Sequence, residues 1–180
     1  MLKAKDLQTL GFHTESDAPS AELLGGGDLR DAHRAQALRN ILSDYALEAL
    51  PKDESDGIPK IDTDAILAVL LPLLQGKTVE ECYIVMLGHR GRYDTKLVAR
   101  GGTDSVQIST REITKQLLLN DATGVIVAHN HPLGYPQHSP RDIETIQKLK
   151  RILDPLQIAL VDSIVIAADT FTSLRKSGGL

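Results

Sequence analysis

The chain has 180 residues, of which 42% are hydrophobic and 24% charged, and its formal net charge is −4. This length and apolar content suffice for one domain with a buried core and an extension. The negative charge and an aromatic content of 3% argue against a protein built to bind nucleic acid through phosphate contacts and base stacking.

Cysteine usage and hydropathy both point to the cytoplasm. The single cysteine, Cys82, excludes an internal disulfide, suits a reducing compartment and, within its apolar surroundings, is expected in the core. The N-terminus lacks the apolar run of a signal peptide. The longest apolar run, Ala65–Leu74, has ten residues, well short of the roughly 20 that a membrane helix needs. We therefore expect a soluble, cytoplasmic protein with no membrane association.

Residues 1–60 predict an N-terminal extension that is mostly helical or loosely ordered. A glycine run at 25–27 and scattered acids indicate a loose arm over residues 1–29. Apolar residues then recur at steps of three and four, which predicts a helix over residues 31–50 with one buried face. A charged, turn-rich stretch at 51–59 is typical of a linker. The expected buried face of the helix consists of Leu38, Ile41, Leu42, Tyr45 and Ala49.

The main domain is expected to span residues 61–180 and to begin with a helix after Asp62 that stops at Gly76. Because this helix is apolar on almost every face, it should lie between other elements. Pro72 should kink it or end it early. The strands that follow are expected at residues 82–87 and 93–99, which form a hairpin, and at 106–108.

The second half of the chain alternates helices with strands. Ser109 should cap one helix, with Glu112 as its capping-box partner, and Ser139 followed by Pro140 should start another. Strands alternating with helices, plus one hairpin, indicate an α/β or α+β layered domain. The expected strand segments are 125–128, 157–161 and 163–167, the last two broken at Asp162, with turns over 170–180.

Two histidines, one residue apart, directly follow the strand at 125–128. Side chains at i and i+2 of an extended segment share a side, so His129 and His131 can converge on one ion while Asn130 points the other way. Asp142 lies in the first turn of the helix capped by Ser139, facing the loop that carries the histidines. Two imidazoles and a carboxylate leave a fourth position for water, as in catalytic zinc sites. Alternatively, the histidines merely end a strand, and the serine and aspartate only cap a helix.

The whole string resembles the JAMM (MPN-type) metalloprotease motif, which is His-x-His, seven residues, Ser, two residues, Asp. Residues 132–138 are the seven, and His-Asn-His-Pro followed by Gly is similar to the RadC branch of that family. The resemblance covers residues 61–180. It implies a JAB/MPN-like (cytidine deaminase-like) mixed sheet flanked by helices. It also implies that His129, His131 and Asp142 hold Zn²⁺ and that Ser139 donates a hydrogen bond to the oxyanion.

Hydrolysis of an amide at zinc also needs a general base. The candidates are Glu80 and Glu81, just before the first strand. They point to opposite faces of an extended backbone, so only one can serve. In the JAMM family the glutamate precedes an apolar strand and often has a cysteine two residues on, as Glu80 has Cys82. The resemblance favours Glu80 and leaves Glu81 as the alternative, while the nearby His138 is expected to be only a loop residue.

The resemblance implies a zinc-dependent peptidase or isopeptidase that acts on a peptide or protein substrate through metal-activated water. One alternative is a DNA-repair-associated accessory or binding protein with a noncatalytic metal site. A cationic cluster within residues 90–100 would serve it, but the solvated face of a hairpin explains that cluster equally well, and the net charge does not support DNA association. A noncatalytic scaffold should lack ligands. Departures from the RadC pattern that bear on substrate preference are Leu133, Tyr135 and Ser163.

Overall fold

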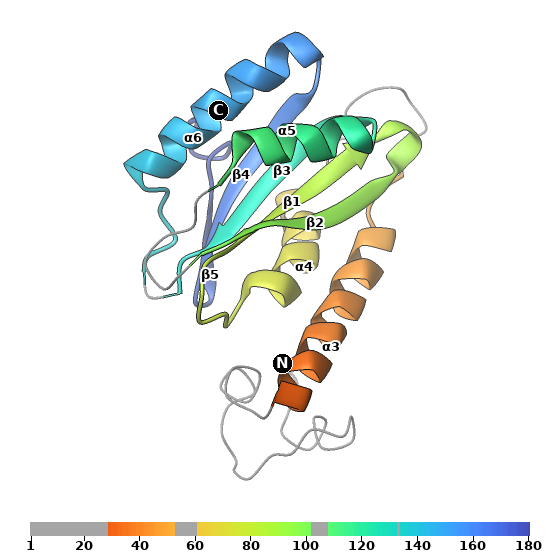
Figure 1. Cartoon of the computed structure of the whole chain (residues 1–180), viewed down its shortest axis with the longest axis vertical. Coiled ribbons are helices and arrows are strands. Elements are labelled where there is room, and N and C mark those ends of the chain that lie inside the picture. Colours follow the sequence, from red (N-terminus) through yellow and green to blue (C-terminus); the bar gives the residue numbers. More distant parts are fainter. Residues whose placement is uncertain (1–28, 53–60, 102–107, 133) are drawn as a thin grey trace.

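The computed structural model describes residues 29–52, 61–101, 108–132 and 134–180. A five-stranded mixed sheet crosses the middle of the molecule with helices on both faces, which confirms the expected α/β class (Figure 1). The strand order is β2-β1-β3-β4-β5; β3 and β4 run parallel, and every other neighbouring pair is antiparallel. The strands are β1 (Glu81–Gly88), β2 (Tyr93–Arg100), β3 (Ala122–Asn130), β4 (Ala159–Ala167) and β5 (Thr170–Ser173).

Strands β1 and β3 carry apolar side chains on both faces, as strands covered by helices on both sides require. Every residue of β1 except Gly88 is buried, and so is every residue of β3 except Thr123. The hairpin between β1 and β2 turns through left-handed backbone at Arg90 (φ 58°) and Gly91 (φ 65°), which matches the twist of antiparallel strands.

One face of the sheet is covered by α5 (Thr110–Leu119) and α6 (Pro140–Leu153), and the other by α4 (Thr63–Leu74) and α3 (Leu29–Glu48) (Figure 1). Each face has its own apolar core. Residues Ile84, Met86 and Val127 point toward α5 and α6, whereas their neighbours along the strands point toward α4. The sheet therefore separates two environments, and the face to which a residue points decides which of them it enters.

Helix α4 lies between the sheet and α3, as its all-round apolar sequence predicts. Pro72 falls in its last turn and the helix ends at Leu74, in agreement with the expected early end. Arg39 of α3 donates hydrogen bonds of 2.8 Å to the carbonyls of Pro72 and Gln75, which satisfies acceptors that the end of a helix leaves unpaired.

The predicted buried face of α3 is wrong. Ala35 and Ser43 pack inward on either side of Arg39, whereas Ile41 and Tyr45 are 63% and 76% exposed. The small residues allow α3 to approach α4 closely, and the hydrogen bonds of Arg39 fix its rotation. The apolar stripe therefore faces solvent.

Two strand predictions also need correction. The segments at 157–161 and 163–167 form one strand, β4, because the register shifts beside Asp162 without breaking the ladder. The predicted turns at 170–180 begin with a short strand, β5. The strand expected at 106–108 lies mostly outside the described residues, and Ile108 is not in a strand. Within the described ranges, every helix is too short or too polar to span a bilayer.

Candidate metal centre

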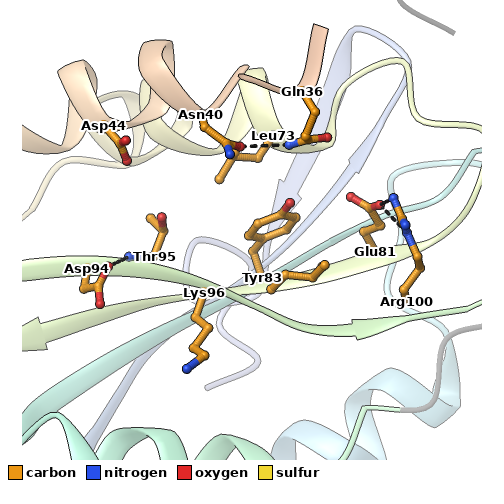
Figure 2. Close-up of a pocket in the computed structure, with 11 residues that line it drawn as sticks. Gln36, Asn40, Asp44, Leu73, Glu81, Tyr83, Asp94, Thr95, Lys96 and Arg100 are labelled. Atoms are coloured by element: carbon orange, nitrogen blue, oxygen red, sulfur yellow. Dashed lines mark hydrogen bonds and ion pairs between the residues drawn. The ribbon is translucent and has the colours of Figure 1, made fainter. Parts of the chain in front are cut away.

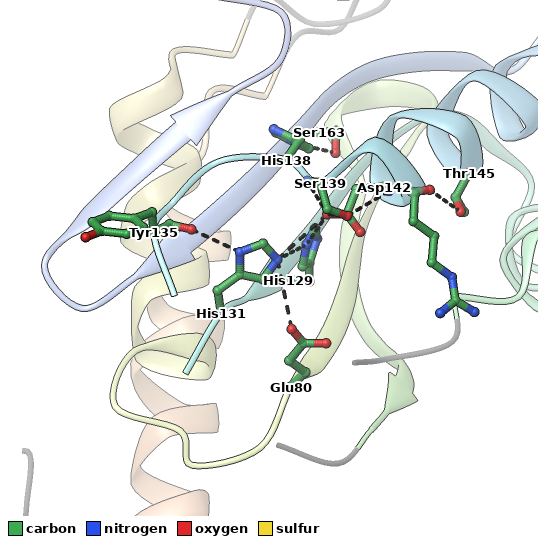
Figure 3. A network of polar contacts seen from close by, with 10 residues as sticks. Glu80, His129, His131, Tyr135, His138, Ser139, Asp142, Thr145 and Ser163 are labelled. Atoms are coloured by element: carbon green, nitrogen blue, oxygen red, sulfur yellow. Dashed lines mark hydrogen bonds and ion pairs between the residues drawn. The ribbon is translucent and has the colours of Figure 1, made fainter. Parts of the chain in front are cut away.

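Three side chains meet at one end of the sheet, where β3 ends and α6 begins (Figure 3). The Nε2 atoms of His129 and His131 are 3.1 Å apart. Asp142 Oδ2 lies 3.6 Å from the first of these atoms and 3.7 Å from the second. The sequence prediction that two histidines and this aspartate converge is thus matched by the geometry.

The extended backbone continues beyond the end of β3, which explains why the two imidazoles share a side. The backbone N–H of His131 donates a 2.8 Å hydrogen bond to the carbonyl of Ile166 in β4, so the residue keeps the ladder of the parallel pair. His129 lies on the same face as Val127, toward α5 and α6. His129 is almost fully buried, whereas 17% of the His131 side chain is exposed.

A capping box holds the third ligand candidate. Asp142 Oδ2 accepts hydrogen bonds of 2.7 Å from both the backbone N–H and the hydroxyl of Ser139, and Ser139 Oγ accepts from the Asp142 backbone N–H. Burial alone would raise the pKa of Asp142, but the contact with His129 and the hydrogen bonds from Ser139 outweigh it and hold this pKa well below its usual range. The carboxylate is therefore charged and fixed in orientation.

A hydrogen bond on the side away from the cluster orients the ring of His131. Its Nδ1 lies 3.0 Å from the backbone carbonyl of Tyr135. A carbonyl only accepts, so Nδ1 carries the proton and the Nε2 lone pair faces the cluster, the arrangement that metal-binding histidines use. His129 Nδ1 is buried and has no hydrogen-bond partner among the described residues.

The donor set fits zinc. One ligand atom from each of the three side chains lies within 4.8 Å of the others. Zinc–nitrogen and zinc–oxygen bonds of about 2.0–2.1 Å in tetrahedral geometry place ligand atoms roughly 3.3 Å apart. The measured separations of 3.1, 3.6 and 3.7 Å lie close to that value. Two neutral nitrogens and one carboxylate, with an open side, are the ligand set of catalytic zinc sites.

Glu80 directly precedes β1 and Glu81 is its first residue, and their side chains enter different environments. Glu80 points toward the cluster, with Oε1 3.9 Å from His131 Nε2 (Figure 3). Glu81 points to the opposite face, where its buried carboxylate pairs with Arg100 at 2.5 Å and with Lys77 at 3.1 Å. Of the two candidate bases, only Glu80 lies beside the histidines.

Asn130 fixes the position of Glu80, a role that the sequence did not indicate. Its side-chain Nδ2 donates a 3.0 Å hydrogen bond to the carbonyl of Val79, and its Oδ1 accepts a 2.8 Å bond from the N–H of Glu81. These bonds hold the residues on both sides of Glu80 to the end of β3. The amide does point away from the side of the two histidines, as expected, and it contacts the backbone on both sides of Glu80.

A groove of about 580 Å³ lies on the other face of the sheet, between α3 and strands β1 and β2 (Figure 2). Tyr83, Thr95 and Asn40 line it, and the Glu81–Arg100 pair lies at one end. The groove contains none of the residues of the metal cluster. It belongs to the face that Glu81 enters, and the sheet separates it from the side chain of His129.

The sequence is similar to one family of known proteins. The family model of the RadC-like JAB domain matches residues 61–180, two thirds of the chain. The chain belongs to the RadC-like JAB-domain family. Helix α3 precedes the matched residues.

Curated relatives agree with this assignment. The chain is 24% identical to a UPF0758 protein of Symbiobacterium thermophilum over 92% of its own length and 75% of that protein. It is 32% identical to one from Acaryochloris marina over 67% of its length and 50% of the relative. It is 33% identical to one from Synechocystis over 68% of its length and 52% of the relative. The chain therefore spans about half the length of the latter two.

Two of the residues that depart from the RadC pattern, Tyr135 and Ser163, make contacts in or with the loop before α6. Tyr135 contributes its backbone carbonyl to His131, while its side chain is 82% exposed. Ser163 on β4 forms a 3.0 Å hydrogen bond between its Oγ and His138 Nε2. Leu133 lies outside the described residues.

His138 is more than a loop residue. Its ring centroid is 6.2 Å from that of His129, and the hydrogen bond to Ser163 joins the loop before α6 to β4. Burial, reinforced by the neighbouring His129, lowers the pKa of His138 to about 4, so its imidazole is neutral near pH 7. The sequence signal for this role was weak, because nothing in the chain's local pattern links residues 138 and 163.

Cys82 is not placed to act as a nucleophile. It is fully buried in the core under α5 and α6, as its apolar surroundings predicted. Burial raises the pKa of its thiol, which keeps the nucleophilic thiolate from forming.

Proposed function

We propose that this protein is a zinc-dependent hydrolase that cleaves a peptide or isopeptide bond. The observation that carries the proposal is the triangle of two Nε2 atoms and one carboxylate oxygen with a free carboxylate, Glu80, 3.9 Å from one corner. Membership in the RadC-like JAB family supports it. Structural zinc sites are closed by four protein ligands, whereas the described residues supply three here, with the Glu80 carboxylate beside them.

His129, His131 and Asp142 would hold the ion. When bound, zinc supplies a Lewis acid that makes water a nucleophile near pH 7. The low pKa of Asp142 keeps its carboxylate ready as a ligand. The hydrogen bond from His131 to Tyr135 keeps the Nε2 lone pair aimed at the ion.

Glu80 would move the proton. Its carboxylate takes a proton from the attacking water as oxygen bonds to the carbonyl carbon, and returns it to the nitrogen as the carbon–nitrogen bond breaks. The products are an acid and an amine, and Glu80 ends in its starting state. The side chain is 11% exposed, so it can reach both water and a substrate at the mouth of the site.

Ser139 would stabilise the negative oxygen that forms on the carbonyl. In the structure its hydroxyl donates to Asp142 Oδ2. A hydroxyl hydrogen can rotate, and the backbone N–H of Ser139 still holds the same carboxylate oxygen when it does. The hydroxyl is thus free to donate to substrate without the loss of the ligand's orientation.

The test replaces each glutamate in turn by its isosteric amide. Glu80→Gln should retain zinc and fold while losing at least about 100-fold in rate, since general-base catalysis contributes roughly 10²–10⁴-fold. Cleavage would be followed by mass spectrometry on a peptide library and on peptides with a lysine-linked isopeptide branch, with zinc-loaded protein.

Glu81→Gln is the matched control. It should lower stability, because the variant loses a buried charge that pairs with Arg100, yet the protein that remains folded should turn over substrate at the normal rate. Wild-type rates in Glu80→Gln, or no cleavage of any amide by zinc-loaded wild type, would refute the proposal.

A further inference from the structure

The outward face of α3 carries an apolar stripe that the described part of the chain leaves uncovered. Ile41 is 63% exposed, Leu42 45% and Tyr45 76%, all within five consecutive positions. Figure 1 shows α3 at the margin of the molecule, with α4 on its inner side and no other labelled element beyond it. Other exposed large apolar residues, such as Leu156 and Phe171, do not form such a row.

The stripe has the spacing of a helix–helix seam. Arg34, Leu38, Ile41, Tyr45 and Glu48 follow one another at steps of four, three, four and three residues. This alternation of steps places residues along the single line where one helix meets another in a coiled coil. The pattern is separate from the inner face, where Ala35, Arg39 and Ser43 are buried and Ala46 and Leu47 pack against the core that contains α4.

The ends of the seam carry opposite charges. Arg34 lies seven residues before Ile41 and Glu48 seven residues after it, and both are exposed. If two copies of the helix meet antiparallel with Ile41 at the centre, Arg34 of each copy faces Glu48 of the other. A parallel pair would instead place like charges together at both ends, which is destabilising.

We propose that two copies of this chain associate through their α3 helices, antiparallel, about a two-fold axis that passes near Ile41. Ile41 packs on its own copy, and Leu38 packs against Tyr45 of the other chain. The contact is isologous, so it closes at the dimer. It lies on the sheet face opposite the metal cluster, so it does not depend on the proposed hydrolase activity.

The expected dimer is reversible. An α-helix of 20 residues is about 30 Å long. One pair of such helices buries less than the roughly 1,200–2,000 Å² of a standard stable interface. The mass of the full chain, measured by sedimentation equilibrium, should therefore rise with concentration from 19.6 kDa toward twice that value.

Charge reversal tests the antiparallel register. Arg34→Glu alone and Glu48→Arg alone should each weaken association at least about tenfold, because each creates two pairs of like charges. The double variant Arg34→Glu/Glu48→Arg should restore it. Failure of the double variant to restore association would overturn the antiparallel arrangement.

Ile41→Lys should give a monomer at every concentration, since two ammonium groups would meet at the axis. Leu119→Lys is the matched control, because Leu119 is also exposed, at 70%, but lies on α5. It should associate like wild type. Circular dichroism should show that all variants are folded. A wild type that stays at 19.6 kDa, or an Ile41→Lys variant that still doubles its mass, would overturn the proposal.

Discussion

Single side chains owe their roles here to which face of the sheet they enter. Glu80 and Glu81 are adjacent and chemically alike, yet one lies beside His131 and the other is paired with Arg100 across the sheet. The alternation of an extended chain predicts this separation. It does not predict which residue meets the metal side, because that depends on the pairing of β1 with β3. The register, with Cys82 opposite His129, decides it.

Asn130 is expected to position Glu80 for catalysis. Asn130→Ala removes both hydrogen bonds that hold the backbone around Glu80, so the turnover number should fall at least about tenfold while zinc stays bound. The free energy of unfolding should drop by about 1–3 kcal/mol, because Val79 O and Glu81 N lose their buried partners.

The readout that separates positioning from stability is steady-state kinetics below the melting temperature. A positioning role predicts a lower turnover number with an almost unchanged KM. Asn130→Asp keeps the acceptor for Glu81 N and should recover part of the rate. Full activity in Asn130→Ala would show that Glu80 does not need this support.

The cluster itself was predictable from local rules. His129 and His131 share a side because the chain is extended, and Asp142 is placed by a capping box that sequence spacing reveals. His138 and Asn130 were not predictable, because their partners Ser163 and Glu81 are 25 and 49 residues away. Contacts of that range depend on sheet register, which single-sequence patterns leave open.

The N-terminal caps of α5 and α6 have similar sequences but different hydrogen bonds. Ser109 and Ser139 each accept a 3.2 Å hydrogen bond from the backbone N–H three residues on. The expected reciprocal box is complete only in α6, where Asp142 returns the bond; in α5 the Glu112 side chain accepts from Gln116 instead. The α6 cap thus orients the Asp142 carboxylate as well as starting a helix.

Comparison of the two caps gives a second prediction. Ser109→Ala and Ser139→Ala should each lower the free energy of unfolding by about 1 kcal/mol, the usual value of such a cap. Only Ser139→Ala should also lower the rate of hydrolysis, by roughly 10²–10³-fold, through loss of the oxyanion donor. Thermal melts and kinetics on both variants separate the two effects. Equal rates in the two variants would remove Ser139 from the chemistry.

Strand β4 contains a buried acid, Asp162, whose polarity led to the wrong prediction of a strand break. Asp162 predicts a break, yet it is buried in a continuous strand, where it accepts from the backbone of Ser163 and Arg175 and from Ser173 Oγ at 2.6 Å. The carboxylate thereby holds the end of β5 and the turn after it. A buried acid with several donors is compatible with a sheet, but the donors are not visible from its own neighbourhood in the sequence.

At the scale of the whole molecule, the sheet separates two working faces. The face under α5 and α6 leads to the cluster of His129, His131 and Asp142, and the face under α4 and α3 carries the groove and the outward stripe of α3. The layered α/β class followed from periodicity alone. The orientation of α3 did not, because Ile41 and Tyr45 point outward while the small residues Ala35 and Ser43 are buried beside Arg39, and Ala46 and Leu47 pack against the core.

The metal centre is tested most directly by zinc content, measured by elemental analysis on untagged protein. Wild type and the control His89→Ala, a turn residue away from the cluster, should each carry about one zinc per chain, and His129→Ala/His131→Ala should carry none. Absence of zinc from wild type after incubation with zinc at neutral pH, or equal zinc in all three proteins, would contradict a metal centre at these residues.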